Sequence, residues 1–233
     1  MSLPFFYETG VPTASSHFTL SEETSKHCIQ VLRMKTGENL QLTNGKGLLY
    51  TASIVSEDKK KTVVLINELQ NIPQPVKKIS VCISLLKNTI RFEWFLEKAT
   101  EIGATEIQPL ICSRTEHTRF RHERMNGILI AAMLQSQQVW LSILHEPVIF
   151  KNYIPHAMFQ QKLIAHCEGE KKQLIKDLPI FNETQILIGP EGDFTPEEIQ
   201  LAINNQYLPI SLGETRLRTE TAGVVATALL ANR

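Results

Sequence analysis

Two strand–loop–helix segments near the end of the chain constrain its fold more than any other feature. In the first, an apolar strand is followed by the glycine-containing loop 189–194 and by a helix that begins with a capping box at Thr195. In the second, a short strand at 208–212 leads into the loop 213–221 and a helix of small apolar residues that ends near Ala231. Parallel strands of an open α/β sheet carry ligand-binding loops at their carboxyl ends. We therefore expect these two loops to form the functional site.

The chain from about residue 78 up to this pair alternates strand-like and helix-like patterns. The strand candidates cover 79–85, 106–111 and 161–167, and the helix candidates end at Gly103 and cover 122–139. This alternation predicts an α/β domain with a mostly parallel sheet and helices on its faces. Pro109 lies inside the second strand. Because proline cannot donate a ladder hydrogen bond, we expect that strand to avoid a central place in the sheet.

Residues 1–72 are expected to form a small, mainly β domain. Asn44-Gly45 lies between two apolar runs and predicts a hairpin with a type I′ turn. A short helix is predicted after Thr19, with its buried stripe formed by Cys28, Val31 and Leu32. Two prolines at 73 and 75 favour an extended linker, and the pattern changes after it. The predicted second domain therefore covers 73–233.

Composition and motifs exclude several classes of function. The 24 basic and 24 acidic residues cancel, so a nucleic-acid partner has to be met by a local patch of cations. The four cysteines are widely spaced and the seven histidines show no metal-ligand pattern, so we expect reduced thiols in a cytoplasmic protein without a metal site. No signal peptide, membrane span, nucleophile elbow, phosphate-binding loop or dinucleotide fingerprint is recognisable.

Clustered cations supply two candidate contacts to RNA phosphates. Arg33 and Lys35 lie close together in the N-terminal domain, and a basic cluster that includes Arg114 and Arg119 precedes and enters the long helix. Contacts with phosphates dominate the affinity of proteins for nucleic acids. The alternative for both groups is an ordinary solvated surface.

The two loops and their surroundings resemble one known family. At 187–192, 212–213 and 217–222 the chain reads LIGPEG, LG and LRTETA, and it closely resembles the RsmE family of SPOUT-superfamily methyltransferases there. The resemblance extends to the helix end at 98–104 and to the segment 27–47, so that it covers nearly the whole chain. It implies methylation of N3 of one uridine in 16S ribosomal RNA, within the assembled small ribosomal subunit.

The resemblance also implies a fold and a cofactor. The N-terminal domain would be a PUA-like β-barrel that binds RNA, and the C-terminal SPOUT domain would thread its last segment into a trefoil knot. S-adenosylmethionine would lie bent in that knot, and each active site of a homodimer would be completed by the partner chain, with no membrane or metal involved. The implied cofactor-binding residues are His166, Gly189, Pro190, Glu191, Gly192, Leu212, Gly213, Leu217, Thr219 and Thr221.

Two residues of the second loop are the candidates for catalysis. Glu220 would accept the N3 proton of uracil, and Arg218 would hold a phosphate or stabilise the developing imidate. The alternative for Glu220 is a structural carboxylate at a helix start, where the helix dipole favours it. Positions 3, 137 and 215 depart from the family, which often carries arginine in these places. Two other functions stay open: methylation of another base or of a ribose 2′-hydroxyl, and RNA binding without catalysis.

Overall fold

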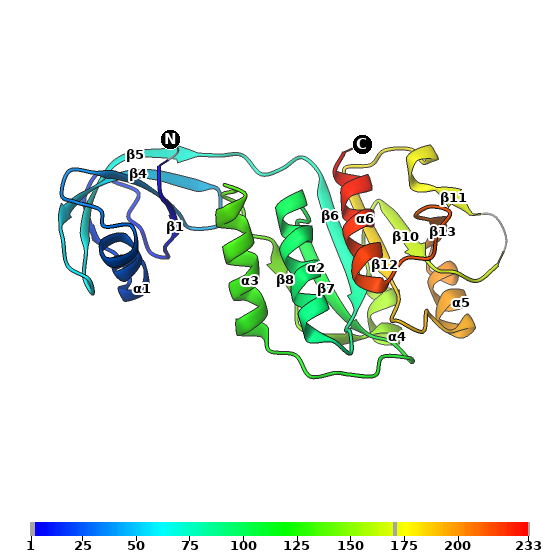
Figure 1. Cartoon of the computed structure of the whole chain (residues 1–233). Coiled ribbons are helices and arrows are strands. Elements are labelled where there is room, and N and C mark those ends of the chain that lie inside the picture. The colour runs from blue at the N-terminus through cyan, green and yellow to red at the C-terminus, as the bar shows by residue number, and fades with distance from the viewer. Residues whose placement is uncertain (1–2, 170–171, 233) are drawn as a thin grey trace. The chain divides into compact units, whose positions relative to one another are not determined.

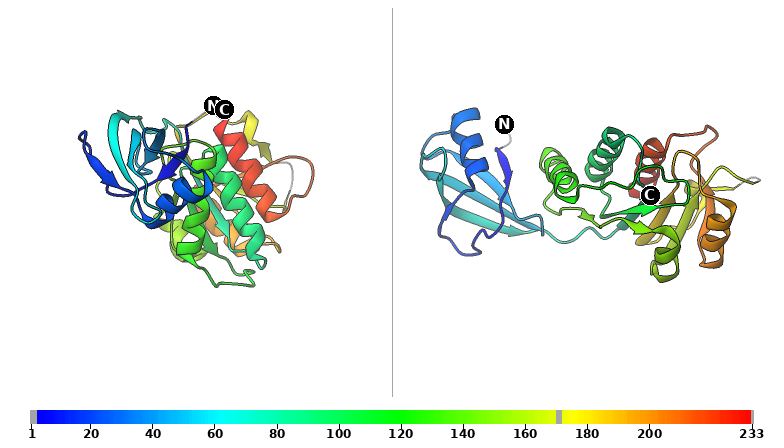
Figure 2. Two further views of the ribbon diagram at one scale, coloured as in Figure 1. Left: turned by 60° about the vertical axis from the view of Figure 1, so that its left-hand side comes forward. Right: turned by 90° about the horizontal axis from the view of Figure 1, so that it is seen from below.

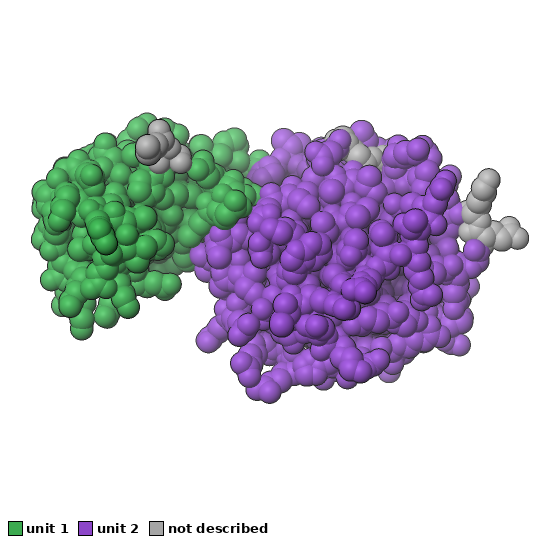
Figure 3. All heavy atoms as spheres, viewed as in Figure 1, with its two compact units in different colours: residues 1–74, 133–141 green, residues 75–132, 142–233 purple. Residues whose placement is uncertain are grey.

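A computed structural model describes residues 3–169 and 172–232, which divide into two compact units. Unit 1 consists of residues 1–74 with 133–141, and unit 2 of residues 75–132 with 142–233 (Figure 3). The sequence did not single out 133–141 as part of the first unit. Each unit is described separately below.

Unit 1 is built on a five-stranded mixed sheet in the order β1-β3-β4-β5-β2 (Figure 1). β1 runs parallel to β3, and the remaining pairs are antiparallel. Its core is formed by inward-facing apolar residues such as Leu40, Leu42 and Tyr50. The strands are β1 (Phe5–Tyr7), β2 (His17–Thr19), β3 (Asn39–Thr43), β4 (Leu48–Ser56) and β5 (Val63–Asn71).

Two local predictions for unit 1 need correction. The hairpin between β3 and β4 is present, but its loop has four residues, so a two-residue type I′ turn is wrong. Asn44 shapes the loop instead, because its Oδ1 accepts hydrogen bonds from the backbone N–H groups of Lys46 and Leu48. The helix α1 (Glu22–Lys26) passes into a π-helical turn at His27–Val31. That turn buries Cys28 but leaves Val31 65% exposed, so the predicted stripe is wrong.

Trp140 attaches the segment 133–141 to the strands of unit 1. Its indole Nε1 donates to the carbonyl of Ile72 at 3.1 Å, and Lys46 forms an isolated antiparallel bridge with Trp140. Gly47 makes this contact possible. It has a φ of 85°, and a Cβ there would lie 2.3 Å from the Trp140 ring. A side chain at position 47 would therefore displace the segment.

Unit 2 contains an eight-stranded sheet in which every pair of neighbouring strands is parallel. The order is β11-β13-β10-β12-β6-β7-β8, and β9 also pairs with β7. The mostly parallel α/β sheet predicted from the sequence is confirmed. The strands are β6 (Lys78–Ser84), β7 (Glu106–Ile111), β8 (Ile143–Leu144), β9 (Val148–Ile149), β10 (Gln161–Ala165), β11 (Gln173–Leu174), β12 (Glu183–Ile188) and β13 (Leu208–Ser211).

Helices cover both faces of this sheet. α2 and α6 lie side by side on one face, and α4 and α5 lie on the other (Figures 1 and 2). Gly223 allows α6 to approach α2 closely, because a Cβ there would lie 2.6 Å from the Phe95 ring. The predicted caps are confirmed at Gly103, which has a φ of 112°, and at the capping box of Thr195. The α-helices are α2 (Thr89–Ile102), α3 (His122–Gln135), α4 (Phe150–Tyr153), α5 (Pro196–Asn204) and α6 (Thr219–Ala231), with short 3₁₀ turns at Ile154–His156 and Ile175–Asp177.

Two predictions for the middle of the chain differ from the structure. α3 ends at Gln135 rather than near 139, and Gln137 has a φ of 58°. β7 lies inside the sheet, between β6 and β8, in spite of Pro109. Proline is tolerated there because β8 pairs only with the start of β7 and β9 only with its end. Pro109 falls between these two pairings, where its missing N–H leaves no ladder bond unmade.

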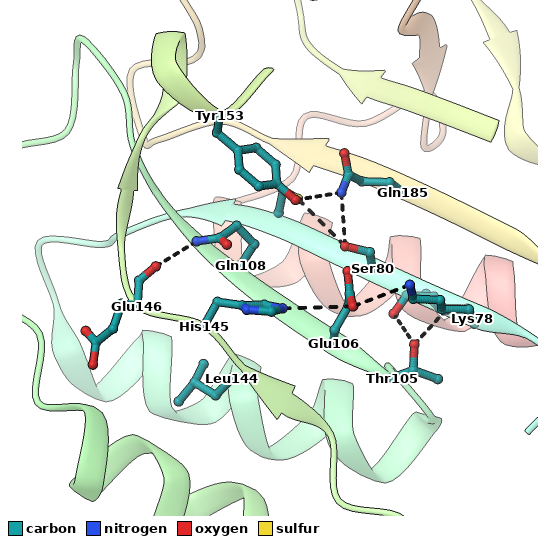
Figure 4. Close-up of polar contacts among 12 residues, drawn as sticks. Lys78, Ser80, Thr105, Glu106, Gln108, Leu144, His145, Glu146, Tyr153 and Gln185 are labelled. Carbon is teal, nitrogen blue, oxygen red and sulfur yellow. Dashed lines mark hydrogen bonds and ion pairs between the residues drawn. The ribbon is translucent and has the colours of Figure 1, made fainter. Parts of the chain in front are cut away.

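A chain of polar side chains is buried on the sheet face that α4 and α5 cover. Gln185 on β12 is its centre: its Nε2 donates to Tyr153 Oη at 2.9 Å and to Ser80 Oγ at 3.2 Å (Figure 4). Its Oε1 accepts from Tyr207 Oη. Gln185 and Ser80 are fully buried, and their polar atoms are all engaged in this way. We call these four residues the polar network.

Candidate functional site

The main cavity of unit 2 lies at the carboxyl ends of the parallel strands β10, β12 and β13. It has a volume of about 660 Å³ and is closed on one side by the start of α6. This is the size of a site for a small organic molecule, and it occupies the place where open α/β sheets bind ligands. Its lining residues are Arg91, Ala165, His166, Cys167, Lys172, Ile188, Gly189, Pro190, Glu191, Asp193, Ile210, Ser211, Leu212, Gly213, Glu214, Thr215, Arg216, Leu217, Arg218, Thr219 and Ala222.

Most residues that the sequence singled out for a cofactor lie around this cavity. Two of the ten, Gly192 and Thr221, do not line it. The structure thus brings the three predicted loops together around one space. The predicted residues that line the cavity are His166, Gly189, Pro190, Glu191, Leu212, Gly213, Leu217 and Thr219.

Gly192 faces Arg114 rather than the cavity. Arg114 Nη1 donates to the carbonyl oxygen of Gly192 at 2.6 Å and to that of Phe194 at 3.3 Å. A Cβ on Gly192 would lie 3.3 Å from Cδ of Arg114. The guanidinium of Arg114 therefore holds the 189–194 loop, a structural contact that the sequence did not indicate.

Asp193 joins two of the three loops. Its Oδ2 accepts a hydrogen bond from the backbone N–H of Cys167 at 2.7 Å, and its Oδ1 accepts from the N–H of Phe194 at 2.8 Å. Its φ of 64° lies in the left-handed region, which Asp and Asn tolerate better than other non-glycine residues. Within the same loop, Phe194 packs so closely against Gly189 that a Cβ on Gly189 would lie 3.1 Å from Phe194. The 166–168 and 189–194 loops are thus fixed relative to each other.

His166 brings unpartnered polar atoms to the cavity. Its Nδ1 and Nε2 are both buried, and neither has a hydrogen-bond partner among the described residues. Burial lowers the pKa of His166, and the nearby charge of Lys172 lowers it further. The imidazole is therefore neutral at physiological pH, with one nitrogen able to donate and the other able to accept. A buried polar group without a partner is unfavourable unless a ligand satisfies it.

Glu220 lies at the first turn of α6 and does not itself line the cavity, although the residue before it, Thr219, does. It is 6% exposed, and its Oε2 has no hydrogen-bond partner within the described chain. Arg91 Nε lies 3.7 Å from its Oε1, and Arg91 also lines the cavity. Arg218 lines the cavity as the N-cap residue of α6, but its side chain makes no capping hydrogen bond. Arg218 and Arg91 therefore line the cavity, and Glu220 is linked to it through the ion pair with Arg91.

The four predicted RNA-contact residues have different surroundings. Arg33 is exposed and has a φ of 57°, whereas Lys35 Nζ lies 3.4 Å from Glu57. Arg114 holds the 189–194 loop, as described above. Arg119 is exposed and lines a second, smaller cavity of unit 2. No RNA is present, so their contacts with RNA stay predictions.

Sequence reasoning missed a number of residues that line the main cavity. Most of them are sequence neighbours of the two motifs. They could be predicted from the motifs if the loops were known to converge on one cavity. Arg91 is different, because it lies in α2, far from both loops in the sequence, and no local pattern pointed to it. The missed residues are Arg91, Ala165, Cys167, Lys172, Ile188, Asp193, Ile210, Ser211, Glu214, Thr215, Arg216 and Ala222.

None of the helices in residues 3–169 and 172–232 is long and apolar enough to cross a membrane. Within the same residues, no group of three or more histidine, cysteine, aspartate or glutamate side chains is placed to hold a metal ion.

The sequence matches two protein families that divide the chain. Residues 73–231 match the RNA methyltransferase domain, and residues 20–66 match the RNA methyltransferase PUA domain. The ribosomal RNA small subunit methyltransferase E of Synechocystis is 28% identical over 219 residues, which are 90% of this chain and 71% of that protein.

Solved structures share the fold along the whole chain. A "probable rRNA-methyltransferase" from Porphyromonas gingivalis is 33% identical, with a TM-score of 0.92, 99% of this chain covered and 98% of that one. The ribosomal RNA small subunit methyltransferase E of Neisseria gonorrhoeae was solved bound to S-adenosyl methionine. It is 26% identical, with a TM-score of 0.90, 99% of this chain covered and 98% of that one.

Proposed function

Because this chain belongs to the RNA methyltransferase family that includes ribosomal RNA small subunit methyltransferase E, we propose that it transfers a methyl group from S-adenosylmethionine to 16S ribosomal RNA. The target that we propose is N3 of one uridine, the one numbered 1498 in the small-subunit RNA. The observation that carries this proposal is the cavity at the carboxyl ends of β10, β12 and β13, formed by the three loops with their family motifs.

The cavity fits S-adenosylmethionine in size and in chemistry. Its volume of about 660 Å³ is sufficient for a bent nucleoside with an amino-acid tail. His166 offers a donor and an acceptor that lack partners in the chain, and Gly213, with a φ of 152°, exposes backbone without a side chain. When bound, S-adenosylmethionine supplies the methyl group on a cationic sulfonium. We propose that the lining residues of the 166–168, 189–194 and 212–219 loops hold it.

Methylation of uracil N3 requires a base that accepts the N3 proton, and a charged residue near the cavity can act as that base. Uracil N3 carries a hydrogen, so its lone pair becomes available only when a base accepts that proton. We assign this role to Glu220, because its Oε2 is buried, unpartnered and adjacent to the lining residue Thr219. Arg91, at 3.7 Å from Oε1, keeps the carboxylate oriented. Arg218 stabilises the negative charge that develops on the uracil oxygens, or holds an RNA phosphate.

RNA recognition is assigned to both units. Residues 20–66 match a PUA domain of RNA methyltransferases, which supports RNA binding by unit 1. N3 lies on the base-pairing edge of uracil, so the target uridine must be unpaired when it enters the cavity. We propose that the substrate is the assembled small ribosomal subunit in the cytoplasm.

We also propose a homodimer and the trefoil knot that the family resemblance implies. α6 carries apolar residues that stay half-exposed, among them Val224, Val225 and Leu229, which is consistent with burial against a second copy. For the knot, the support is the family resemblance together with the path of the chain, which leads from β13, beside β10, to α6, packed on β6 and α2. Analytical ultracentrifugation tests the dimer, and a stable monomer at micromolar concentration would contradict it.

The methylated product is the direct test of function. Purified protein is incubated with S-adenosylmethionine and with small subunits from cells that lack the gene, and the rRNA nucleosides are analysed by mass spectrometry. We expect N3-methyluridine at the single position. A different methylated base or a 2′-O-methylated ribose would keep the methyltransferase and move its target. No methylation of subunits or free rRNA, together with RNA binding, would favour a non-catalytic RNA-binding protein.

A further inference from the structure

A second cavity of unit 2, with a volume of about 320 Å³, has three arginines among its eight lining residues, and we call it the basic cavity. It lies between the first turn of α2 and the start of α3, and the segment that precedes α3 forms its rim. Within the described chain this cavity is separate from the 660 Å³ cavity, since the two share no lining residue. The lining residues are Thr89, Ile90, Glu93, His117, Arg119, Arg121, Arg124 and Met125.

The cations of this cavity are not balanced by acidic groups. The single carboxylate in the lining, Glu93, is already bound by Arg124, with Nε–Oε1 at 2.7 Å and Nη2–Oε2 at 3.1 Å. The guanidinium groups of Arg119 and Arg121 form no hydrogen bond or ion pair with any residue in 3–169 or 172–232. Two guanidinium groups are therefore left for an external anion. Guanidinium groups bind phosphate in a bidentate manner.

Phe120 keeps these two arginines in place. Its ring packs edge-on against Phe92, with centroids 6.2 Å apart, and against His122, with centroids 6.0 Å apart. Because Phe120 is anchored to the helices on either side, its neighbours Arg119 and Arg121 are held at the rim. Ile90, which is 73% exposed, adds an apolar surface to the same cavity. Positive charge beside an exposed apolar surface suits a nucleotide, which has an anionic phosphate and an apolar base face.

The two cavities are adjacent because the first turn of α2 contributes to both. Thr89 and Ile90 line the basic cavity, and the next residue, Arg91, lines the large cavity and contacts Glu220. This turn thus gives a strand of RNA that presents one base to the large cavity a short path to the basic cavity.

We propose that the basic cavity binds the phosphate and ribose of a nucleotide next to the target uridine, in single-stranded RNA. This inference rests on the proposed function and adds the site that holds the flanking nucleotide. It assigns Arg119 and Arg121 to phosphate contacts, and it assigns Arg124 to the internal pair with Glu93.

The test compares two double variants with the same change of charge. Arg119→Gln with Arg121→Gln removes the two unpaired guanidinium groups. The control, Lys151→Gln with Lys176→Gln, removes two exposed cations of unit 2 that line neither cavity. For each protein, the measurements are binding of a single-stranded 16S rRNA fragment against salt concentration, the KM for small subunits, kcat, and the affinity for S-adenosylmethionine by calorimetry.

We expect the arginine variant to bind the fragment at least about tenfold more weakly at low salt. Each phosphate contact with single-stranded RNA contributes about −0.7 to the slope of log affinity against log salt, so loss of two contacts should flatten the slope by about 1.4. The KM for subunits should rise, while kcat and the cofactor affinity stay within about twofold of the parent. The lysine variant should match the parent.

Two results would overturn the inference while the proposed function stands. One is an arginine variant with the parent's slope and KM. The basic cavity would then not contact RNA and would be a candidate site for a protein partner. The other is an equal loss in the lysine variant, which would indicate a general effect of charge. Failure of the parent to methylate any RNA would instead contradict the proposed function, and the fragment-binding slopes would still decide whether the basic cavity binds RNA.

Discussion

Unit 2 contains two groups of buried polar side chains, and they differ in how completely they are paired. In the polar network, the amide of Gln185 forms hydrogen bonds with Tyr153, Ser80 and Tyr207 on the face of the sheet that α4 and α5 cover, away from the loops. After β10 and in the first turn of α6, His166 and Glu220 bury polar atoms that the described chain leaves without partners.

This difference separates a role in folding from a role in function. A fully paired network rigidifies the core and becomes costly when one member is removed. Unpaired atoms in a cavity reduce stability slightly, and a protein retains them where a ligand or a substrate provides the missing partner. Changes in the network should therefore affect unfolding, whereas changes at the cavity should affect binding and turnover.

Glu220 is expected to give the largest effect. Glu220→Gln keeps the shape of the side chain but cannot accept the N3 proton, so kcat should fall by about 10²–10⁴-fold. The free energy of unfolding should change by no more than about 1 kcal/mol, because Oε2 has no partner to lose. Turnover with small subunits and urea denaturation measure the two quantities. A variant that retains the parent's kcat would make Glu220 a structural residue of the α6 start.

Gln185 should show the opposite behaviour. Gln185→Leu leaves the hydroxyls of Tyr207, Tyr153 and Ser80 without their amide partner in the core, so we expect a loss of about 2–4 kcal/mol in the free energy of unfolding. Calorimetric affinity for S-adenosylmethionine, measured where the variant is folded, should match the parent. Comparable stability of variant and parent would show that the network is not a stabilising element.

Asp193 lies between these extremes, because its hydrogen bonds join two loops of the cavity. Asp193→Ala should weaken cofactor binding by about tenfold and destabilise the fold by about 1–2 kcal/mol, since it removes the acceptor for the Cys167 N–H and a residue that tolerates a φ of 64°. Asp193→Asn is the matched control, because asparagine tolerates the same backbone and keeps one oxygen. Equal losses in the two variants would point to the charge of Asp193 rather than to its geometry.

The smallest effect is a dependence of stability on pH. Burial lowers the pKa of His166 in the folded chain, so the unfolded chain binds its proton more readily, with a pKa of about 6.5. Stability should therefore be lost as the pH falls from about 7.5 through 6.5, and His166→Gln should lose less than the parent over this interval. Urea denaturation at about pH 7.5 and about pH 5.5 compares the two, and parallel losses would mean that His166 is not the group responsible.

The sequence predicted the part of the site that depends on local patterns. The strands before Gly189 and Gly213 and the capping box at Thr195 all follow from short-range rules, and they place the two loops at one edge of the sheet. The family motifs added the 166–168 loop. The hairpin at Asn44-Gly45 was also predicted, but its predicted type I′ turn was wrong, because the Asn44 side chain holds a four-residue loop, which also pairs with the distant Trp140.

Long-range contacts account for what could not be predicted. Arg91 reaches Glu220 only because α2 packs against α6, and Arg114 reaches the carbonyl of Gly192 across 78 residues of sequence. Pro109 is accommodated inside the sheet because two short strands, β8 and β9, pair with opposite ends of β7. None of these contacts leaves a periodic or compositional signal in a single sequence.

Calorimetric titration with S-adenosylmethionine tests most directly that the cavity at the strand ends is the cofactor site. Leu212 lines the cavity directly after β13, and Leu208, which is 41% exposed at the start of β13, does not line it. We expect one molecule bound per chain, a loss of affinity of about a hundredfold or more in Leu212→Trp, where the indole fills the cavity, and unchanged affinity in Leu208→Trp. Parent protein that does not bind, or Leu212→Trp protein that binds as tightly as the parent, would contradict the account.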